Sequence, residues 1–237
     1  MDVDLCFREY GEYEGNEPDG VTEHWAVVVG CENYKNSRPA KWARNDAKNI
    51  ASLLVESGWS VTLLLDATSS EAYQALNETA DKEDADDVVL FYFSGHGNSH
   101  SMSTSDLSVI NEFLFKIYFL DKLYTNKTVL ILDFCESGGF MSYVQGEGRL
   151  ILASSMDEES SWSSDNLKSG VFTYYLAQGM KGAADGVNGY EKDGMVSAEE
   201  AFAYAAPLTT AYAASRGKSQ HPQMYDGVEG EVILTKV

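Results

Sequence analysis

The stretch VVLFYFSGHG (residues 88–97) is an apolar run that ends in a glycine-containing polar turn. The stretch VLILDFCESGG (residues 129–139) has the same pattern. Both runs are short, rich in β-branched and aromatic residues, and lack the alternation of a half-exposed strand, so each predicts a strand buried on both faces. In a parallel sheet, the residues that follow neighbouring strands meet at one edge. We therefore expect His96 and Cys135 to lie near each other.

A thiol beside an imidazole is the minimum equipment for covalent acyl transfer, because the thiolate attacks a carbonyl and the imidazole returns a proton to the leaving group. The glycines of both turns let backbone approach a substrate and leave N–H groups free to bind an oxyanion. Alone, Cys135 would more often be an inert buried thiol and His96 a structural loop residue. Their placement after two separate strands weakens that alternative.

The paired motifs Phe-Ser-Gly-His-Gly (residues 93–97) and Asp-x-Cys-x-Ser-Gly-Gly (residues 133–139) resemble the catalytic signatures of caspase-fold cysteine peptidases. Within that group they are most similar to metacaspases and to archaeal and bacterial caspase-like proteins. The resemblance extends from about His24 to the C-terminus. It implies that Cys135 is the nucleophile, that His96 is the general acid and base, and that the N–H groups of Gly97 and Cys135 form the oxyanion hole.

The rest of the chain alternates between strand and helix patterns, which is typical of a parallel sheet. We expect strands at residues 24–30, 59–65, 88–93, 129–132, 149–155 and 231–236. We expect helices at residues 43–57, 70–80, 107–123 and 170–180. A further helix is opened by the capping box of Ser197 and Glu200 and is broken or kinked by Pro207. With the resemblance, this predicts an α/β, caspase-like fold with an open, mostly parallel six-stranded sheet flanked by helices on both faces. Residues 1–22 are acidic and aperiodic, so we expect a flexible arm before a peptidase domain at 23–237.

Two acids are candidates for substrate specificity. By the resemblance, Asp46, Asp133 and Ser94 line the pocket for the residue before the cleaved bond. Metacaspases that cut after Arg or Lys have Asp at the position of Asp133, whereas caspases that cut after Asp have Gln, and paired carboxylates suit a guanidinium group. The structural alternatives are a first-turn helix acid for Asp46 and a strand-end cap for Asp133. Trp162, in an acidic serine-rich loop, is a candidate wall for the second substrate residue, with ordinary packing equally open.

Two residues beside the nucleophile depart from the metacaspase pattern. Phe134 and Glu136 stand where Ser and His are usual, and a carboxylate beside the thiol opposes thiolate formation unless it points away or pairs with a base. A caspase-fold scaffold with weak or no turnover is therefore one alternative. Cleavage after acidic residues is another and would need a basic group such as Arg44, and His100 is the competing candidate for the base.

Composition limits the partners. Seventeen basic and thirty-seven acidic residues give a net charge of −20, which opposes binding to nucleic acid or anionic membranes and favours basic protein or peptide substrates, although solubility or a salty environment explains the acidity equally well. A nucleotide binder would need a glycine-rich loop after the first strand, and residues 30–33 (GCEN) do not provide one.

The remaining expectations concern location and cofactors. No apolar run approaches the ~20 residues of a membrane span, the N-terminus does not resemble a signal peptide, and three cysteines in a chain of this length form no disulfide framework. We expect a cytoplasmic monomer that needs no cofactor and has no dedicated metal site. The resemblance leaves calcium activation open, and the acids at residues 157–159 could bind such an ion at most weakly.

Overall fold

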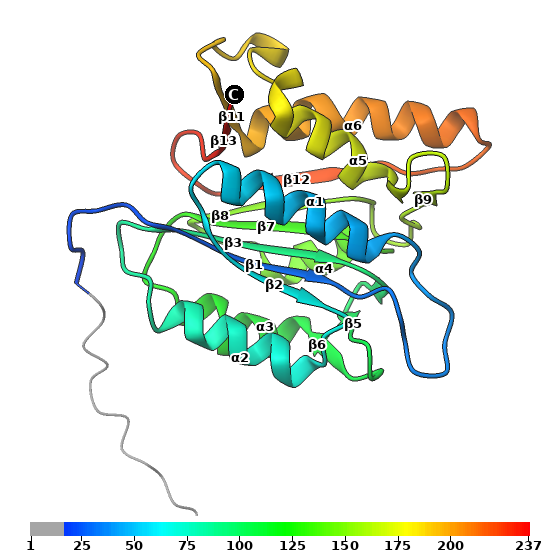
Figure 1. Ribbon diagram of the computed structural model, residues 1–237, viewed down its shortest axis with the longest axis horizontal. Coiled ribbons are helices and arrows are strands. Elements are labelled where there is room, and N and C mark those ends of the chain that lie inside the picture. Colours follow the sequence, from blue (N-terminus) through cyan, green and yellow to red (C-terminus); the bar gives the residue numbers. More distant parts are fainter. Residues whose placement is uncertain (1–16) are drawn as a thin grey trace, which may run out of the picture.

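A six-stranded sheet forms the centre of the computed structural model, which describes residues 17–237 (Figure 1). The strand order is β12-β8-β7-β3-β1-β2. Five strands are parallel, namely β1 (His24–Gly30), β2 (Ser60–Leu65), β3 (Val88–Ser94), β7 (Thr128–Asp133) and β8 (Arg149–Ala153), while β12 (Gln223–Asp226) runs antiparallel to β8. The predicted α/β class and mostly parallel sheet are confirmed.

Helices cover both faces of this sheet (Figure 1). One layer contains α1 (Ala43–Glu56), α5 (Val171–Gln178) and α6 (Ala198–Ser215), and the other contains α2 (Ser69–Ala80), α3 (Glu112–Tyr118) and α4 (Ser137–Val144). Alternate residues of one strand enter opposite cores, as Leu90 and Tyr92 do on the first side and Phe91 and Phe93 on the second. Burial on both faces explains the continuous apolar runs of the strands.

The sixth strand differs from the prediction. Residues 231–236 contain β13 (Ile233–Lys236), which pairs with β11 (Met195–Ser197) in a separate two-stranded sheet. The sixth strand of the central sheet is instead β12, a short edge strand that is only half-buried. Its sequence, QMYD, has no apolar run, so periodicity offered no signal for it.

The predicted single helix at 107–123 is also wrong in extent. This segment forms β6 (Val109–Asn111), α3 and a 3₁₀ turn at Leu120–Lys122, because the Asn111 side chain accepts the N–H groups that open α3. Strand β6 joins β4 (Gly97–Asn98) and β5 (Ser101–Ser103) in a small antiparallel sheet. Of the predicted apolar cover, Phe115 and Phe119 are buried against the central sheet, whereas Phe113 is 63% exposed.

The C-terminal helix begins as predicted but ends later. Ser197 and Glu200 form a reciprocal capping box at the start of α6. The helix continues through Pro207 to Ser215, so Pro207 does not end it. Buried alanines on both sides of the proline, at 205 and 213, hold the helix against the molecule where its own hydrogen bonding is interrupted.

Smaller elements complete the chain. They are the hairpin strands β9 (Ser163–Ser164) and β10 (Ser169–Gly170), a π-helical turn at Gly179–Ala183 and a 3₁₀ turn at Val187–Gly189. The predicted N-terminal arm lies largely outside the described residues, and its described part, 17–22, is exposed and has no helix or strand. None of the described helices has the length and apolar character needed to cross a membrane.

Candidate active site

The register of the sheet brings the two signature loops together. Ser94 at the end of β3 lies opposite Asp133 at the end of β7, and Gly30 of β1 pairs with Ser94 on the other side. His96 and Cys135 each follow two residues after this pair. Both side chains line one cavity of about 310 Å³, as the strand-end argument predicts.

His96 is held by two contacts from the loop that follows β1. Its backbone N–H donates to the Tyr34 hydroxyl oxygen at 2.7 Å, and the two rings lie 4.8 Å apart. Its Nε2 lies 3.0 Å from the backbone oxygen of Arg38. Because a carbonyl oxygen can only accept, Nε2 carries the hydrogen, and in the neutral ring Nδ1 is then the nitrogen that can take up a proton.

Cys135 is partly buried, and its thiol donates to the backbone oxygen of Ser161 at 3.8 Å. It immediately precedes the N-terminal end of α4, where the helix dipole stabilises negative charge. The neighbouring Phe134 is buried and packs edge-on against Phe93 and Phe140. It also touches Gly97, where a Cβ atom would lie 2.3 Å from the Phe134 ring. Phe134 is therefore a core residue, and only glycine at 97 allows the two loops to approach this closely.

Glu136 adopts a left-handed backbone conformation with φ of 62°. Its carboxylate accepts hydrogen bonds from the N–H and the hydroxyl of Ser99, at 3.2 and 2.9 Å. It lines a separate cavity and is not among the residues around the thiol. The carboxylate thus points toward its own donors and into a cavity other than that of Cys135.

Asp46 and Asp133 lie at the base of the active-site cavity and are only 1% and 5% exposed. Asp46 accepts from the Gly170 N–H at 2.9 Å, from the Ser94 hydroxyl at 3.2 Å and from the Ser169 hydroxyl. Asp133 accepts from the hydroxyls of Ser161 and Thr173, at 2.6 and 2.7 Å. In residues 17–237 neither carboxylate has an ion-pair partner.

The two acids converge on one glycine. A Cβ atom on Gly170 would lie 2.5 Å from an oxygen of Asp133 and 3.1 Å from an oxygen of Asp46. Burial raises the pKa of Asp46 to about 7, and the nearby negative charge of Asp133 adds to the effect. The cavity therefore has a negative floor that lacks a counter-ion.

The competing candidates lie elsewhere. His100 points Nδ1 at Glu112, 3.1 Å away, and lines the cavity that contains Glu136. Arg44 pairs with Asp66 at 3.4 Å and does not line the cavity of Cys135. The bases that do line this cavity, Arg38 and Lys41, are exposed at its rim, and Lys41 is bonded to Asp165.

Several site residues carry no local motif in the sequence. They are Tyr34, Arg38, Ser161, Ser169, Gly170, Thr173 and Gln220, and most come from segments far along the chain from the residue they contact. Gln220 is buried and bonds both the Trp162 N–H and the Ser161 hydroxyl, at 3.1 and 3.2 Å. Only the serine-rich composition of the loop at 156–167 signalled a polar site here.

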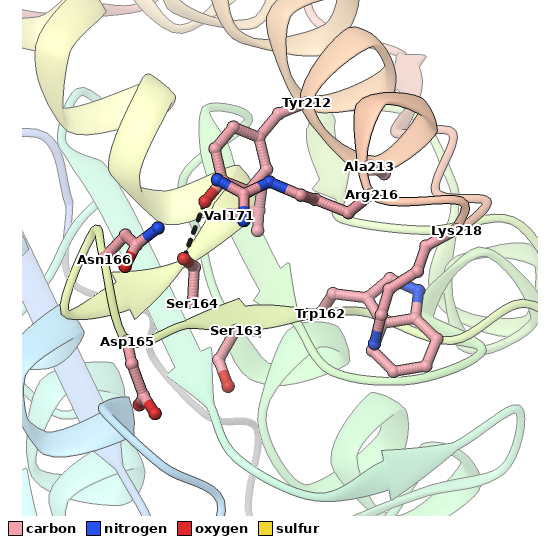
Figure 2. Close-up of a pocket in the computed structure, with 10 residues that line it drawn as sticks. All are labelled: Trp162, Ser163, Ser164, Asp165, Asn166, Val171, Tyr212, Ala213, Arg216 and Lys218. Carbon is pink, nitrogen blue, oxygen red and sulfur yellow. Dashed lines mark hydrogen bonds between the residues drawn. The ribbon is translucent and has the colours of Figure 1, made fainter.

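Trp162 separates the active-site cavity from a neighbouring one and lines both. Its indole N–H donates to the backbone oxygen of Ser219 at 3.0 Å, and the Lys218 ammonium nitrogen lies 3.1 Å from its ring centroid (Figure 2). The ring is thus a fixed wall at the position where a substrate wall was expected, and its contact with substrate remains a prediction.

Comparison with known proteins agrees with this fold. The model of the caspase domain family matches residues 23–231. The chain belongs to the caspase family. Its fold is that of a cysteine peptidase, and it is similar to the crystal structure of caspase-1 from Spodoptera frugiperda, with a TM-score of 0.70 and 15% sequence identity over 91% of this chain and 90% of that one. No curated protein sequence matches it.

The acids at residues 157–159, where the sequence suggested at most weak calcium binding, do not converge on one point. Asp157 and Glu159 bind different partners, Ser99 and His221. In the described part of the chain, the acids that could share a cation are Asp19, Asp84 and Asp86, whose oxygens lie within 4.8 Å of one another. With one oxygen from each, these acids supply three ligands, and calcium prefers roughly six to eight.

The two described cysteines should differ in reactivity. Cys31 is fully buried, and burial raises the pKa of its thiol to about 12, so it stays protonated at neutral pH, whereas Cys135 reaches the cavity. We expect iodoacetamide to alkylate Cys135 faster than Cys31 by on the order of a hundredfold at neutral pH. Mass spectrometry of tryptic peptides measures both rates. Equal rates in the folded protein would contradict the assignment, and equal rates in urea are the control.

Proposed function

We propose that this caspase domain is a metacaspase-type cysteine endopeptidase that cleaves after Arg or Lys through Cys135 and His96. The observation that carries the proposal is the buried pair of carboxylates, Asp46 and Asp133, in the same cavity as the thiol and the imidazole. A cationic side chain would supply the counter-ion that the pair lacks.

The reaction uses groups that the cavity already contains. The Cys135 sulfur, its proton taken by Nδ1 of His96, bonds to the substrate carbonyl carbon, and the N–H groups of Gly97 and Cys135 bind the oxyanion. Nδ1 then protonates the leaving amine as the peptide bond breaks, which leaves a thioester. A water molecule, deprotonated by Nδ1 of His96, attacks the thioester carbonyl carbon. The carbon–sulfur bond then breaks, the acid product leaves, and the Cys135 sulfur takes the proton back from His96. Because Arg38 accepts from Nε2, the ring keeps one orientation through both proton transfers.

The preference for Arg or Lys follows from the charge and the burial of the groups at the base of the cavity. An Arg or Lys side chain that enters toward Gly170 meets two carboxylates and the Ser94 hydroxyl, all nearly buried, so its hydrogen bonds are made in a low-dielectric site. An acidic side chain would meet like charge at the same place. The rim bases do not change this, because they are exposed and Lys41 is already paired.

The rest of the proposal, on substrates, location and cofactors, repeats the expectations from the sequence analysis. The substrates are proteins or peptides with basic residues, the enzyme is a cytoplasmic monomer without nucleic-acid or membrane partners, and the thiol and imidazole need no cofactor. No step is assigned to calcium, because the acid group at Asp19 is incomplete. The scaffold alternative rests on Glu136 and on the short loop after His96, and of these Glu136 is bound by Ser99.

The direct test is a panel of fluorogenic peptides ending in Arg, Lys, Asp or Asn, with and without calcium. We expect turnover of the Arg and Lys peptides, loss of turnover in Cys135→Ala, and a fall on the order of a hundredfold or more in His96→Ala, because proton transfer is lost. His100→Ala is the matched control and should retain activity. Cleavage by Cys135→Ala, or greater damage from His100→Ala, would overturn the assignment.

Asp133→Asn tests the pocket without changing its shape. The amide oxygen can still accept from the Thr173 N–H and hydroxyl, and the amide nitrogen can donate to the Ser161 hydroxyl oxygen, so the loss is mainly one charge. We expect kcat/KM for Arg peptides to fall by about tenfold to a hundredfold, with a change in the free energy of unfolding of less than about 1 kcal/mol. Arg44→Ala is the control, because Arg44 lies outside the cavity. The reverse pattern, lower stability with unchanged specificity, would make Asp133 a structural cap.

The raised pKa of Asp46 gives the pocket a pH dependence. The protonated form prevails below about pH 7 and the charged form above it, and only the charged form attracts a guanidinium. We therefore expect a peptide ending in Arg amide to bind Cys135→Ala more tightly at about pH 8 than at about pH 6, by roughly tenfold. Calorimetry measures the affinity, and adding Asp46→Asn should flatten the profile. A profile that survives Asp46→Asn would assign the titration to another group.

A further inference from the structure

Gln220 is a buried side chain that contacts the active-site loop from outside the cavity. It lies in the segment between α6 and β12, where the chain turns back along the molecule (Figure 1). Its side chain is fully buried, and it does not line the active-site cavity, whereas its partners Ser161 and Trp162 do. Burying a polar amide is costly unless its atoms are hydrogen-bonded, so the partners of this amide indicate what it does.

The Gln220 amide has a partner for each hydrogen and for its oxygen. Its Nε2 donates to the backbone oxygen of Ser154 at 3.0 Å and to the Ser161 hydroxyl oxygen at 3.2 Å. Its Oε1 accepts the Trp162 N–H at 3.1 Å. A flipped amide would set its oxygen against the Ser154 carbonyl oxygen and its NH₂ group against the Trp162 N–H. The amide therefore takes one orientation, with Nε2 as the donor to Ser161.

This orientation decides where the Ser161 hydroxyl donates. A hydroxyl has one hydrogen and an amide nitrogen can only donate, so the Ser161 oxygen accepts from Gln220. The Ser161 hydrogen is then directed to the Asp133 carboxylate, 2.6 Å away. Without the amide, the hydroxyl loses the donor that excludes its other orientations. Gln220 thus acts on one of the two buried carboxylates of the proposed pocket without entering the cavity.

The same stretch of backbone contacts the nucleophile. The Ser161 backbone oxygen accepts from the Cys135 thiol at 3.8 Å. Gln220 holds this stretch at two successive residues, through the Ser161 hydroxyl and the Trp162 N–H. A displacement of residues 161–162 would therefore move groups at the thiol and at the Asp133 carboxylate together.

The residues on either side of Gln220 hold it in place. The Ser219 hydroxyl and His221 Nδ1 both bond the Glu159 carboxylate, at 2.5 and 2.8 Å. The backbone oxygen of Gln220 accepts from the Thr210 hydroxyl of α6 at 3.0 Å. Residues 219–221 are thus bonded to the active-site loop at several points. Connected hydrogen bonds of this kind make a buried polar group a rigid support.

We propose that Gln220 is a positioning residue of the active site, which directs the Ser161 hydroxyl to Asp133 and holds the Ser161 backbone oxygen at the Cys135 thiol. The inference rests on the proposed function, in which Asp133 binds the basic side chain of the substrate. It makes the geometry of the pocket and of the nucleophile depend on one side chain of the C-terminal segment that does not line the cavity.

The first test is a double-mutant cycle on kcat/KM for fluorogenic peptides that end in Arg. We expect Ser161→Ala and Gln220→Met, which puts an apolar side chain of similar size at 220, each to lower kcat/KM by about tenfold. The double variant should stay within about threefold of Gln220→Met, because both residues act on Asp133 through one chain of hydrogen bonds. Gln223→Met is the matched control, because that amide bonds two neighbouring backbone oxygens outside the cavity. A double variant that loses the product of the two single effects would overturn the inference.

The second test is alkylation of Cys135 by iodoacetamide, which needs no substrate. We expect Gln220→Met to raise the alkylation rate by about threefold or more, because the segment at residues 161–162 is released. Ser161→Ala keeps the backbone oxygen and should leave the rate unchanged. Cys31 is fully buried in the core, so its rate reports a general loosening of the fold and should stay low in both variants. An unchanged rate at Cys135, or an equal rise at both thiols, would overturn the inference.

Failure of the proposed function looks different, because the unaltered protein then cleaves no Arg or Lys peptide, and the alkylation rates alone decide the inference. If Gln220→Met does not fold, Gln220→Glu takes its place in both tests. It keeps the shape of the side chain and the acceptor for the Trp162 N–H, but its second oxygen takes the Ser161 hydrogen away from Asp133. Unchanged kcat/KM and an unchanged Cys135 alkylation rate in Gln220→Glu would also overturn the inference.

Discussion

The pairing of β3 with β7, which sets Ser94 opposite Asp133, is the constraint on which the site depends. Every parallel pair in the sheet ends at the same edge, so one register places the imidazole loop, the thiol loop and one carboxylate at a common level. A slip of one residue would turn Asp133 away from this face and Phe134 out of the core. The apolar runs before these loops therefore serve function as much as stability: buried on both faces, they permit only one register.

The buried carboxylates at the base of the cavity lower the stability of the fold. Burying Asp46 beside Asp133 raises its pKa to about 7, from an ordinary value of 3.8, so the folded state favours the protonated form more than the unfolded state does. Stability is therefore lost as pH rises from the ordinary value through the folded one. Donors from Ser94, Ser169 and Gly170 reduce this cost but supply no positive charge. Strain of this electrostatic kind collects at functional sites, where a ligand can relieve it.

The sequence predicted the parts of the fold whose signals are local. The buried strands, the capping box of Ser197 and the two signature loops all follow from short patterns, and the family match and the sheet confirm the fold drawn from them. It failed where tertiary context decides. The edge strand β12 has no apolar pattern, and Asn111 divides an apolar segment that composition alone describes as one helix.

The predictions for the site also succeeded where the signal is local and failed where it is not. His96, Cys135, Asp46 and Asp133 could be named because each lies in or beside a recognisable motif, and the structure places all four at one cavity. Their partners could not, because Gly170 meets Asp46 across 124 residues and Gln220 meets Trp162 across 58. Such contacts arise from how the β9–β10 hairpin and the end of α6 fold over the sheet edge, which no local pattern encodes.

The charges around these long-range contacts favour one class of substrate. The hairpin carries Gly170 to the negative floor, and Trp162, which directly precedes the hairpin, lines both this cavity and its neighbour. A net charge of −20 attracts a basic peptide at long range and repels an acidic one. The buried carboxylates of the floor act at short range on the same side chain, so the general field and the local charges favour one class of substrate.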